Sequence, residues 1–125
     1  MVAKPAQELR VYQQAYALAM EIVDLSRAWP QEETYSLTDQ VRRSTRSVCA
    51  NLKQAWAKRK YEAHFISTLT DADAENDETE TRLDCAMGCH YWPKEQHEQL
   101  SQRCQKIGGM IGAMLNVAPT VVTLP

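Results

Sequence analysis

The chain has 125 residues, of which 44% are hydrophobic and 24% are charged, and its formal net charge at pH 7 is -2. A chain of this length suits a single domain that buries roughly two-thirds of the surface of its unfolded state. The near-neutral charge excludes an overall basic field of the kind that attracts nucleic acid or an anionic membrane.

No targeting or membrane segment is expected. The first ten residues, MVAKPAQELR, lack the apolar core of a secretory signal. The longest uncharged run lies near the C-terminal end, and it is too short and too rich in Gly and Pro to span a bilayer. Four cysteines without a signal indicate reduced thiols rather than a disulfide framework. We therefore expect a cytoplasmic protein that does not enter the membrane.

The first expected helix covers residues 7–28. Its apolar residues follow helical spacing in two neighbouring seams: Leu9, Tyr12, Tyr16, Ala19 and Val23, and beside them Val11, Ala15, Leu18, Ile22 and Leu25. The resulting apolar face is wider than one partner helix needs, so this helix either sinks deep into a bundle or offers part of the face to another subunit. Pro30 ends the helix, and residues 29–35 form a loop.

A second helix is predicted over residues 36–56. It opens with the run from Ser36 to Asp39, which resembles a capping box with Asp in place of the usual Glu or Gln. The apolar seam comprises Leu37, Val41, Thr45, Val48, Leu52 and Ala55. A basic group follows the same helix and its end: Arg42, Arg43, Arg46, Lys53, Lys58, Arg59 and Lys60.

The third helix is predicted over residues 61–91. Its apolar stripe comprises Phe65, Leu69, Ala72, Leu83, Met87 and His90. Asn76 and Thr79 interrupt the stripe, and each needs a hydrogen-bond partner because an unmet buried polar group costs about 1–3 kcal/mol. Acidic residues flank the stripe, with one set at Asp73, Asp77, Glu80 and Asp84 and the other at Asp71, Glu75 and Glu78.

Pro93 predicts the start of a fourth helix, whose apolar seam comprises Leu100, Cys104, Ile107, Ile111 and Met114. Gly108, Gly109 and Gly112 favour close approach of another backbone over fraying. No strand alternation separates the helices. The predicted fold class is therefore all-α, an up-down-up-down antiparallel four-helix bundle. One domain covers residues 1–116, and residues 117–125 form an extended C-terminal tail.

The basic group and the acidic residues have opposite charges of nearly equal size on helices that follow one another. We favour charge matching, within the bundle or between subunits, with the acidic face at Asp73, Asp77, Glu80 and Asp84. A phosphate-binding surface made by the basic group is the alternative, since phosphate contacts need clustered positive charge more than any motif. An ordinary solvated face is the third interpretation.

No motif for catalysis or metal binding is present. None of the three histidines has a Glu three residues before it, which excludes the carboxylate pattern of di-iron bundles. Cys85 and Cys89 are one helical turn apart and could hold zinc only with further ligands, so we expect a buried or half-buried reduced pair. The sequence lacks a nucleophile elbow, a phosphate-cradling loop and a dinucleotide fingerprint. We expect no enzyme activity, no cofactor and no metal.

The run Tyr35-x-Leu-Thr-x-Gln-Val-Arg-Arg43 is followed by Ser47-Val48 and Ala50-Asn51-Leu52. Leu9-x-Val-Tyr-Gln13, Trp29-Pro30 and the acidic run from Ala72 to Glu78 accompany it. These runs, of which the first is the most specific, resemble the four helix bundle protein family, first noticed as proteins encoded by intervening sequences within bacterial 23S rRNA genes. The resemblance covers residues 9–115.

This resemblance implies a four-helix bundle that assembles into a homo-oligomer, commonly a pentameric ring. It also implies a relation to accessory proteins of diversity-generating retroelements, in which a basic oligomer binds nucleic acid and a reverse transcriptase. Because this chain is mildly acidic, we favour a non-catalytic oligomeric scaffold that binds a protein partner. The alternative is a nucleic-acid-associated accessory protein that binds RNA or DNA through the basic group.

Overall fold

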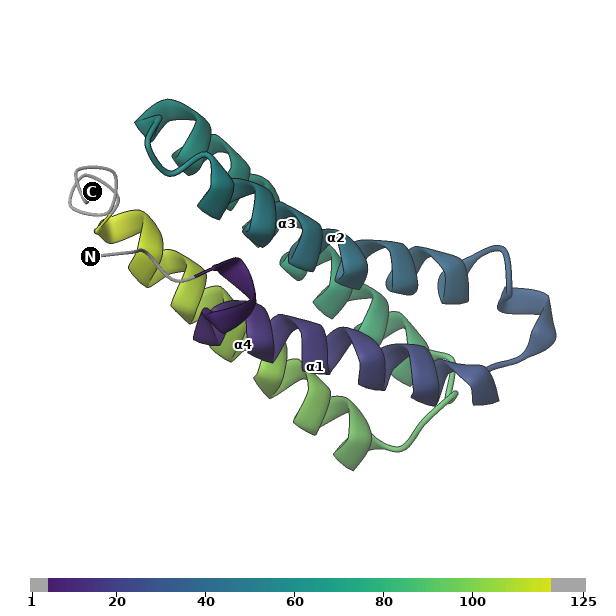
Figure 1. Ribbon diagram of the computed structural model, residues 1–125. Coiled ribbons are helices and arrows are strands. Elements are labelled where there is room, and N and C mark those ends of the chain that lie inside the picture. The colour runs from purple at the N-terminus through teal and green to yellow at the C-terminus, as the bar shows by residue number, and fades with distance from the viewer. Residues whose placement is uncertain (1–4, 118–125) are drawn as a thin grey trace.

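A computed structural model describes residues 5–117 of the chain as four helices in an antiparallel bundle (Figure 1). The helices are α1 (Arg10–Leu25), α2 (Leu37–Ala57), α3 (Glu62–Gly88) and α4 (Lys94–Asn116). Three short 3-10 turns accompany them: η1 (Ala6–Glu8), η2 (Ser26–Ala28) and η3 (Gln31–Glu33). The predicted all-α class is thus confirmed. The expected C-terminal tail lies outside the described residues, except for Val117.

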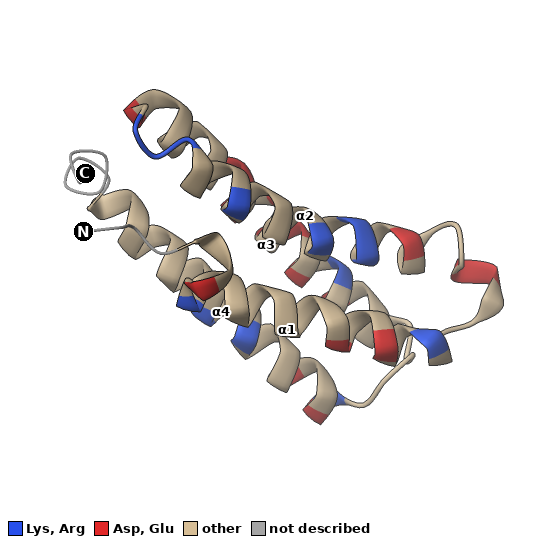
Figure 2. Cartoon of the chain, viewed as in Figure 1, with Lys and Arg blue, Asp and Glu red and all other residues tan. Residues whose placement is uncertain are grey.

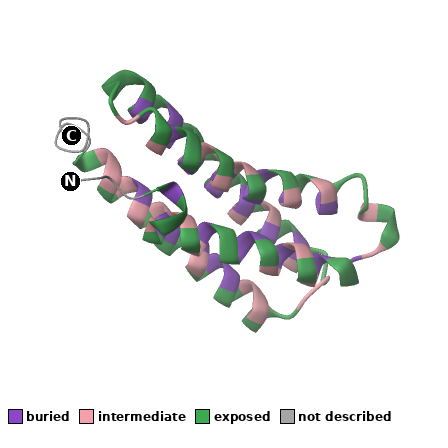
Figure 3. Ribbon diagram, in the orientation of Figure 1, coloured by how far each residue is buried: buried purple, intermediate pink, exposed green. Residues whose placement is uncertain are grey.

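One of the two apolar seams of α1 fills the core. Val11, Ala15, Leu18 and Ile22 are buried. Figure 3 shows that the buried residues of the helices follow the sides that face one another. In the other seam only Ala19 is fully buried, and Tyr16 is 51% exposed. The seam with Tyr16 faces partly outward because α2 and α4 together cover less than the whole apolar face of α1.

The predicted seams of the other helices are largely confirmed. All six apolar-seam residues of α2 are buried, and so are four of the five in α4, with Met114 half-buried. α2 packs against α1 and α3, and α4 packs against α3 and α1, so each helix has two antiparallel neighbours. Among the described residues, no helix is long and apolar enough to cross a membrane.

The predicted capping box at the start of α2 is wrong. Ser36 makes no side-chain hydrogen bond to the helix end, because its backbone (φ -122°, ψ -109°) departs from the extended form of an ordinary N-cap. The Leu37 N–H instead donates to Glu33 Oε1 at 3.4 Å. Asp39 lies 3.7 Å from Arg43 one turn later.

Three aromatic residues close one end of the bundle. Trp29 is buried, and its ring lies 4.9 Å from that of Trp92 and 6.0 Å from that of Tyr91. Tyr91 Oη donates a 2.6 Å hydrogen bond to Glu33 Oε2, which joins η3 to the α3–α4 loop. This bond lowers the pKa of Glu33, and the same bond raises the pKa of Tyr91.

The end of α3 corrects the expectation that His90 belongs to the apolar stripe. α3 ends at Gly88, and His90 is exposed with a φ of 60°. His90 N–H donates to the Met87 carbonyl and Tyr91 N–H to the Ala86 carbonyl, both at 2.9 Å. These two bonds form a Schellman closure in which His90 occupies the left-handed position that glycine usually takes.

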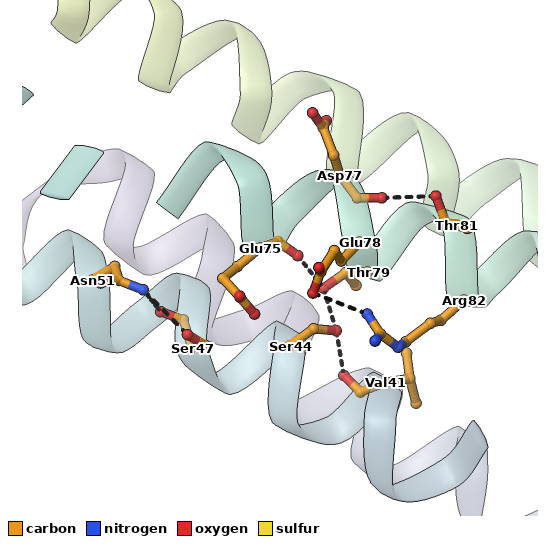
Figure 4. A network of polar contacts seen from close by, with 10 residues as sticks. All are labelled: Val41, Ser44, Ser47, Asn51, Glu75, Asp77, Glu78, Thr79, Thr81 and Arg82. Atoms are coloured by element: carbon orange, nitrogen blue, oxygen red, sulfur yellow. Dashed lines mark hydrogen bonds and ion pairs between the residues drawn. The ribbon is translucent and has the colours of Figure 1, made fainter. Parts of the chain in front are cut away.

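The polar residues in the α3 stripe find the partners that burial requires. Asn76 Nδ2 donates to the Cys104 carbonyl of α4 at 2.8 Å. Thr79 Oγ1 lies 2.8 Å from Ser44 Oγ of α2, as Figure 4 shows. Both interruptions thus tie α3 to its neighbours.

Only one of the three α4 glycines lies close to another helix. A Cβ atom added at Gly108 would stand 3.4 Å from Asn76 Nδ2. At Gly109 and Gly112 it would meet nothing within 4 Å. The expected close packing is therefore wrong for Gly109 and Gly112, which face away from the other helices.

Candidate functional site

The basic residues of α2 divide into three environments. Arg42 is half-buried and serves the fold: its Nε donates to Ser26 Oγ at 2.9 Å and its Nη2 to the Val23 carbonyl at 3.2 Å. It thereby joins α2 to the end of α1. Because both of these donors are occupied within the chain, Arg42 is a poor candidate for phosphate contact.

Arg43 and Arg46 lie on the outer side of α2, beside a groove shared with α3. This groove has a volume of about 810 Å³ and a floor that includes Ser44, Ser47 and Ala50. Its far wall carries Glu75, Glu78 and Arg82 of α3 (Figure 4). Arg43 forms a salt bridge with Asp39, and Arg46 makes no salt bridge to a described residue.

The remaining basic residues gather where α2 ends, and Figure 2 shows the turn into α3 in blue. Arg59 is held in place, with its guanidinium 4.5 Å from the centre of the Trp56 ring and its Nη1 2.8 Å from the Trp56 carbonyl. Lys53, Lys58 and Lys60 are exposed and form no salt bridge between residues 5 and 117. The two lysines of this turn, Lys58 and Lys60, therefore have no acidic partner among the described residues.

The acidic face predicted to match the basic group points elsewhere. Glu80 accepts hydrogen bonds from Ser101 at 2.5 Å and Gln105 at 2.9 Å, and Asp84 lies 2.6 Å from His97 Nε2. All three partners belong to α4. Asp73 and Asp77 occupy the same side of α3, since residues three or four apart share a helix face.

Asp73 confirms the orientation of this acidic face. Its carboxyl oxygen lies near Gly108 of α4, and burial, followed by the neighbouring charge of Asp77, raises its pKa. Within the chain, this face therefore bonds to α4, and charge matching with the basic group between subunits stays a prediction. Leu83 and Ala86 set the rotation of α3 by facing the core, and this rotation turns the face toward α4.

The other acidic side of α3 is the one that meets the groove. Glu75 and Glu78 stand across it from Arg43 and Arg46, but no salt bridge joins α2 to α3 among the described residues. Arg82, also on α3, takes Glu78 as its partner at 3.2 Å. The acidic residues of α3 and the basic residues of α2 thus face one another across the groove without a salt bridge between the two helices.

The burial of the cysteines differs from the prediction for one pair. Cys85 and Cys89 are exposed rather than buried, because Cys85 lies 200° around α3 from the buried Leu83. Cys104 is buried and Cys49 half-buried, and burial raises the pKa of these thiols to about 12 and about 11. Across residues 5–117, no three His, Cys, Asp or Glu side chains converge as metal ligands.

Two features near these surfaces were not predicted from the sequence: the depression beside the basic turn, and the exposed Met20 next to the predicted apolar face of α1. Tyr61 and His64 lie beside the basic turn, with ring centres 6.3 Å apart, and with Lys58 they line a depression of about 300 Å³. In the sequence, Tyr61 and His64 follow the Lys58–Lys60 run directly, and this spacing could have predicted that they lie beside it. On α1, Tyr16 stacks on Tyr12 at 6.3 Å and is followed by Met20, which is 42% exposed.

Comparison with known proteins agrees with this architecture. The model of the 23S rRNA-intervening sequence protein family matches residues 7–113. A similar solved structure is the crystal structure of a protein of unknown function from the S23 ribosomal protein family of Bacteroides thetaiotaomicron. It shares 26% sequence identity with a TM-score of 0.77, and the match covers 85% of this chain and 95% of that one. No curated protein matches.

The family match extends over most of the chain and includes all four helices almost to the end of α4. It contains the Tyr35–Arg43 run and the acidic run of α3 that carried the resemblance, which is therefore confirmed. The chain belongs to the 23S rRNA-intervening sequence protein family.

Proposed function

We propose that this chain is a non-catalytic scaffold that assembles into a homo-oligomer, a pentamer, and binds a protein partner in the cytoplasm. The observation that carries the proposal is the exposed apolar side of α1. Tyr16 is 51% exposed and Met20 42% exposed, on a helix whose other seam already fills the core. The pentamer rests on the family resemblance, and the cytoplasm is consistent with four cysteines that are all free.

The exposed side of α1 has the composition of an interface. Tyr16 and Met20 are one helical turn apart, and Tyr12 stacks on Tyr16 with an interplanar angle of 20°. Tyrosine and methionine are enriched in protein interfaces relative to the rest of the surface. A second chain seated on this side would cover apolar area that α2 and α4 leave open.

A polar network between α3 and α4 supports the absence of catalysis. His97 and Ser101 are one turn apart on α4, a spacing that could pair a base with a nucleophile. Ser101 Oγ instead donates to Glu80, while His97 Nε2 contacts Asp84. The hydroxyl proton therefore points to a carboxylate on α3, and the network serves to hold two helices together.

Light scattering on the wild type and on a Tyr16→Lys, Met20→Lys variant tests this assembly. We expect the wild type to have five times the 14.2 kDa mass of one chain. The variant should have the mass of a single chain and an unchanged helical circular dichroism spectrum, because lysine at these exposed positions disturbs only an interface. Tyr35→Lys is the matched control, since Tyr35 is 94% exposed and lies outside α1. A monomeric wild type would refute the proposal.

The second candidate function is a nucleic-acid-associated accessory protein, and the unpaired basic residues favour it. No acidic residue occurs between Asp39 and Glu62, and Arg46, Lys53, Lys58 and Lys60 have no ionic partner among residues 5–117. Cations that the fold leaves unpaired remain available to phosphates, whose binding weakens steeply with salt.

RNA and DNA titrations at two salt concentrations test this second function with Arg43→Glu, Arg46→Glu. Arg42 is left intact because it joins α1 to α2. We expect the variant to lose the binding that the wild type shows at low salt. Arg10→Glu, Lys106→Glu produces the same change in net charge at exposed positions outside α2 and should keep it. Equal binding by the two variants would contradict a role for the α2 side chains.

A further inference from the structure

We propose that the turn between α2 and α3 binds single-stranded nucleic acid, with an unpaired base stacked on Tyr61 and backbone phosphates at Lys58 and Lys60. The proposal rests on the second candidate function and names the class of nucleic acid and the side chains that select it. It places the specific contact at the end of the helix pair rather than along the α2–α3 groove.

The backbone of the turn brings the basic and aromatic side chains together. α2 ends at Ala57 and α3 begins at Glu62, and the Tyr61 N–H donates to the Lys58 carbonyl at 2.9 Å to close the turn. Arg59 is held against the Trp56 ring at 4.5 Å and bonded to the Trp56 carbonyl. These contacts hold the loop in place, and Figure 2 shows its basic run in blue at one end of the helix pair. Lys58 and Tyr61 line the same depression there.

Tyr61 presents an aromatic surface that the fold does not use. It is 66% exposed, and its ring is nearly perpendicular to that of His64, at 86°, so the two rings do not stack on each other. With Lys58 they line the depression of about 300 Å³, at the lower end of the size range of ligand sites. A base can stack on an exposed aromatic ring whatever its sequence, since every base has a π-face.

The electrostatic surroundings favour an anion at this tip. Glu62 is adjacent in sequence, but the next acidic residue of α3 is Asp71, nine residues or roughly 13 Å further along the helix. That distance exceeds the screening length of about 8 Å at physiological ionic strength. η1 packs against α2 and carries Glu8, with Arg10 of opposite charge close after it. Lys58, Arg59 and Lys60 therefore outweigh the acidic residues around them.

The shape of the site selects single strands over duplexes. In a duplex both faces of each base are covered by neighbouring base pairs, so Tyr61 has nothing on which to stack without extracting a base. The turn also offers no exposed helix side of several turns to enter a major groove. A single strand can place one base on Tyr61 and its flanking phosphates beside the two lysines.

Fluorescence anisotropy with labelled oligonucleotides tests the proposal at low and moderate salt. The probes are oligo-U and oligo-dT of about 12 nucleotides, within the usual site sizes, and a DNA duplex of equal length. The variants are Tyr61→Leu, which keeps an apolar side chain without the π-face, and Lys58→Gln, Lys60→Gln. Tyr35→Leu is the matched control, because Tyr35 is also exposed but lies beyond the other end of α2.

We expect the wild type to bind both single strands more tightly than the duplex. Tyr61→Leu should weaken single-strand binding about tenfold without changing its salt dependence, because stacking releases no counterions. Lys58→Gln, Lys60→Gln should reduce the slope of log K against log salt by about 1.4, at roughly 0.7 per phosphate contact. The ratio of oligo-U to oligo-dT affinity then tells whether RNA or DNA is preferred.

Other outcomes separate this inference from the function on which it rests. Binding that Arg43→Glu, Arg46→Glu abolishes and Tyr61→Leu leaves intact would overturn the inference and keep the second function. Equal affinity for duplex and single strand would also overturn it. No binding of any probe at low salt would overturn both.

Discussion

At the scale of single residues, the Tyr91–Glu33 hydrogen bond makes the stability of the closed end of the bundle depend on pH. The bond lowers the pKa of Glu33 below its ordinary value of 4.5. The stability that the bond contributes is therefore fully present above pH 4.5, and it is lost as the pH falls through the lowered pKa of Glu33. We expect Tyr91→Phe to lower the melting temperature at neutral pH, and the difference from wild type to vanish in acid. Thermal melts between pH 2 and 7 measure this.

Tyr35→Phe is the control for this pH series, because its side chain is almost fully exposed. It should melt like the wild type at every pH. If the melting temperature of Tyr91→Phe stays below that of the wild type by the same amount down to pH 2, the hydrogen bond to the Glu33 carboxylate is not what stabilises this end.

His90 is the other residue whose role depends on its local geometry. Its φ of 60° places a side chain in the left-handed region, which costs roughly 1–2 kcal/mol for residues other than glycine and is hardest for β-branched ones. We expect His90→Val to be less stable than His90→Gly by about that amount in urea unfolding. The reverse order would show that the Schellman closure of α3 does not form in solution.

At the scale of helices, Arg42 and Arg43 are neighbours in sequence with opposite roles. Arg42 bonds to Ser26 and to the Val23 carbonyl across the α1–α2 contact. We expect Arg42→Ala to destabilise the bundle by about 1.5–3 kcal/mol, the range for hydrogen bonds from charged groups. Urea unfolding of purified protein measures the change.

Arg43→Ala is the matched comparison for that measurement. The Arg43 side chain is 77% exposed, and its contact with Asp39 is a surface pair within one helix turn. Such pairs contribute about 0–1 kcal/mol, so this variant should stay near the wild type. Similar losses in both variants would place the effect in the charge of α2 rather than in the α1–α2 bonds.

At the scale of the whole molecule, assembly and stability are linked. If the exposed side of α1 is a subunit interface, association stabilises only the folded chain, and the melting temperature must rise with protein concentration. We expect calorimetry over a hundredfold range of concentration to show such a rise for the wild type. The Tyr16→Lys, Met20→Lys variant should melt at one temperature throughout, and a wild type that does the same would argue against the oligomer.

The distribution of charge over the helices is a second property of the whole molecule. The basic residues are concentrated on α2 and its turn, and the acidic residues on α3, yet no salt bridge joins these helices among residues 5–117 (Figure 2). One acidic side of α3 bonds to α4, and the other faces the groove. The fold therefore uses α3 carboxylates to hold α4 and leaves most of the α2 cations to solvent.

The sequence by itself determined the four helices, most of their core residues and the family. Apolar residues at helical spacing must be buried, so the seam of α2 and the buried Cys104, Ile107 and Ile111 of α4 followed from periodicity alone. The need of Asn76 and Thr79 for partners followed from the cost of burying an unpaired polar group.

Only the tertiary structure decided which neighbouring helix each side of α3 contacts. Spacing places Asp73, Asp77, Glu80 and Asp84 on one side of α3, but the rotation of α3 about its axis, set by Leu83 and Ala86 in the core, turns that side to α4. For the same reason the side chain of Arg42 lies across α1, and Tyr61 and His64 meet Lys58 only after the chain has turned. Helical periodicity sets positions within one helix, whereas contacts between helices depend on how several seams pack at once.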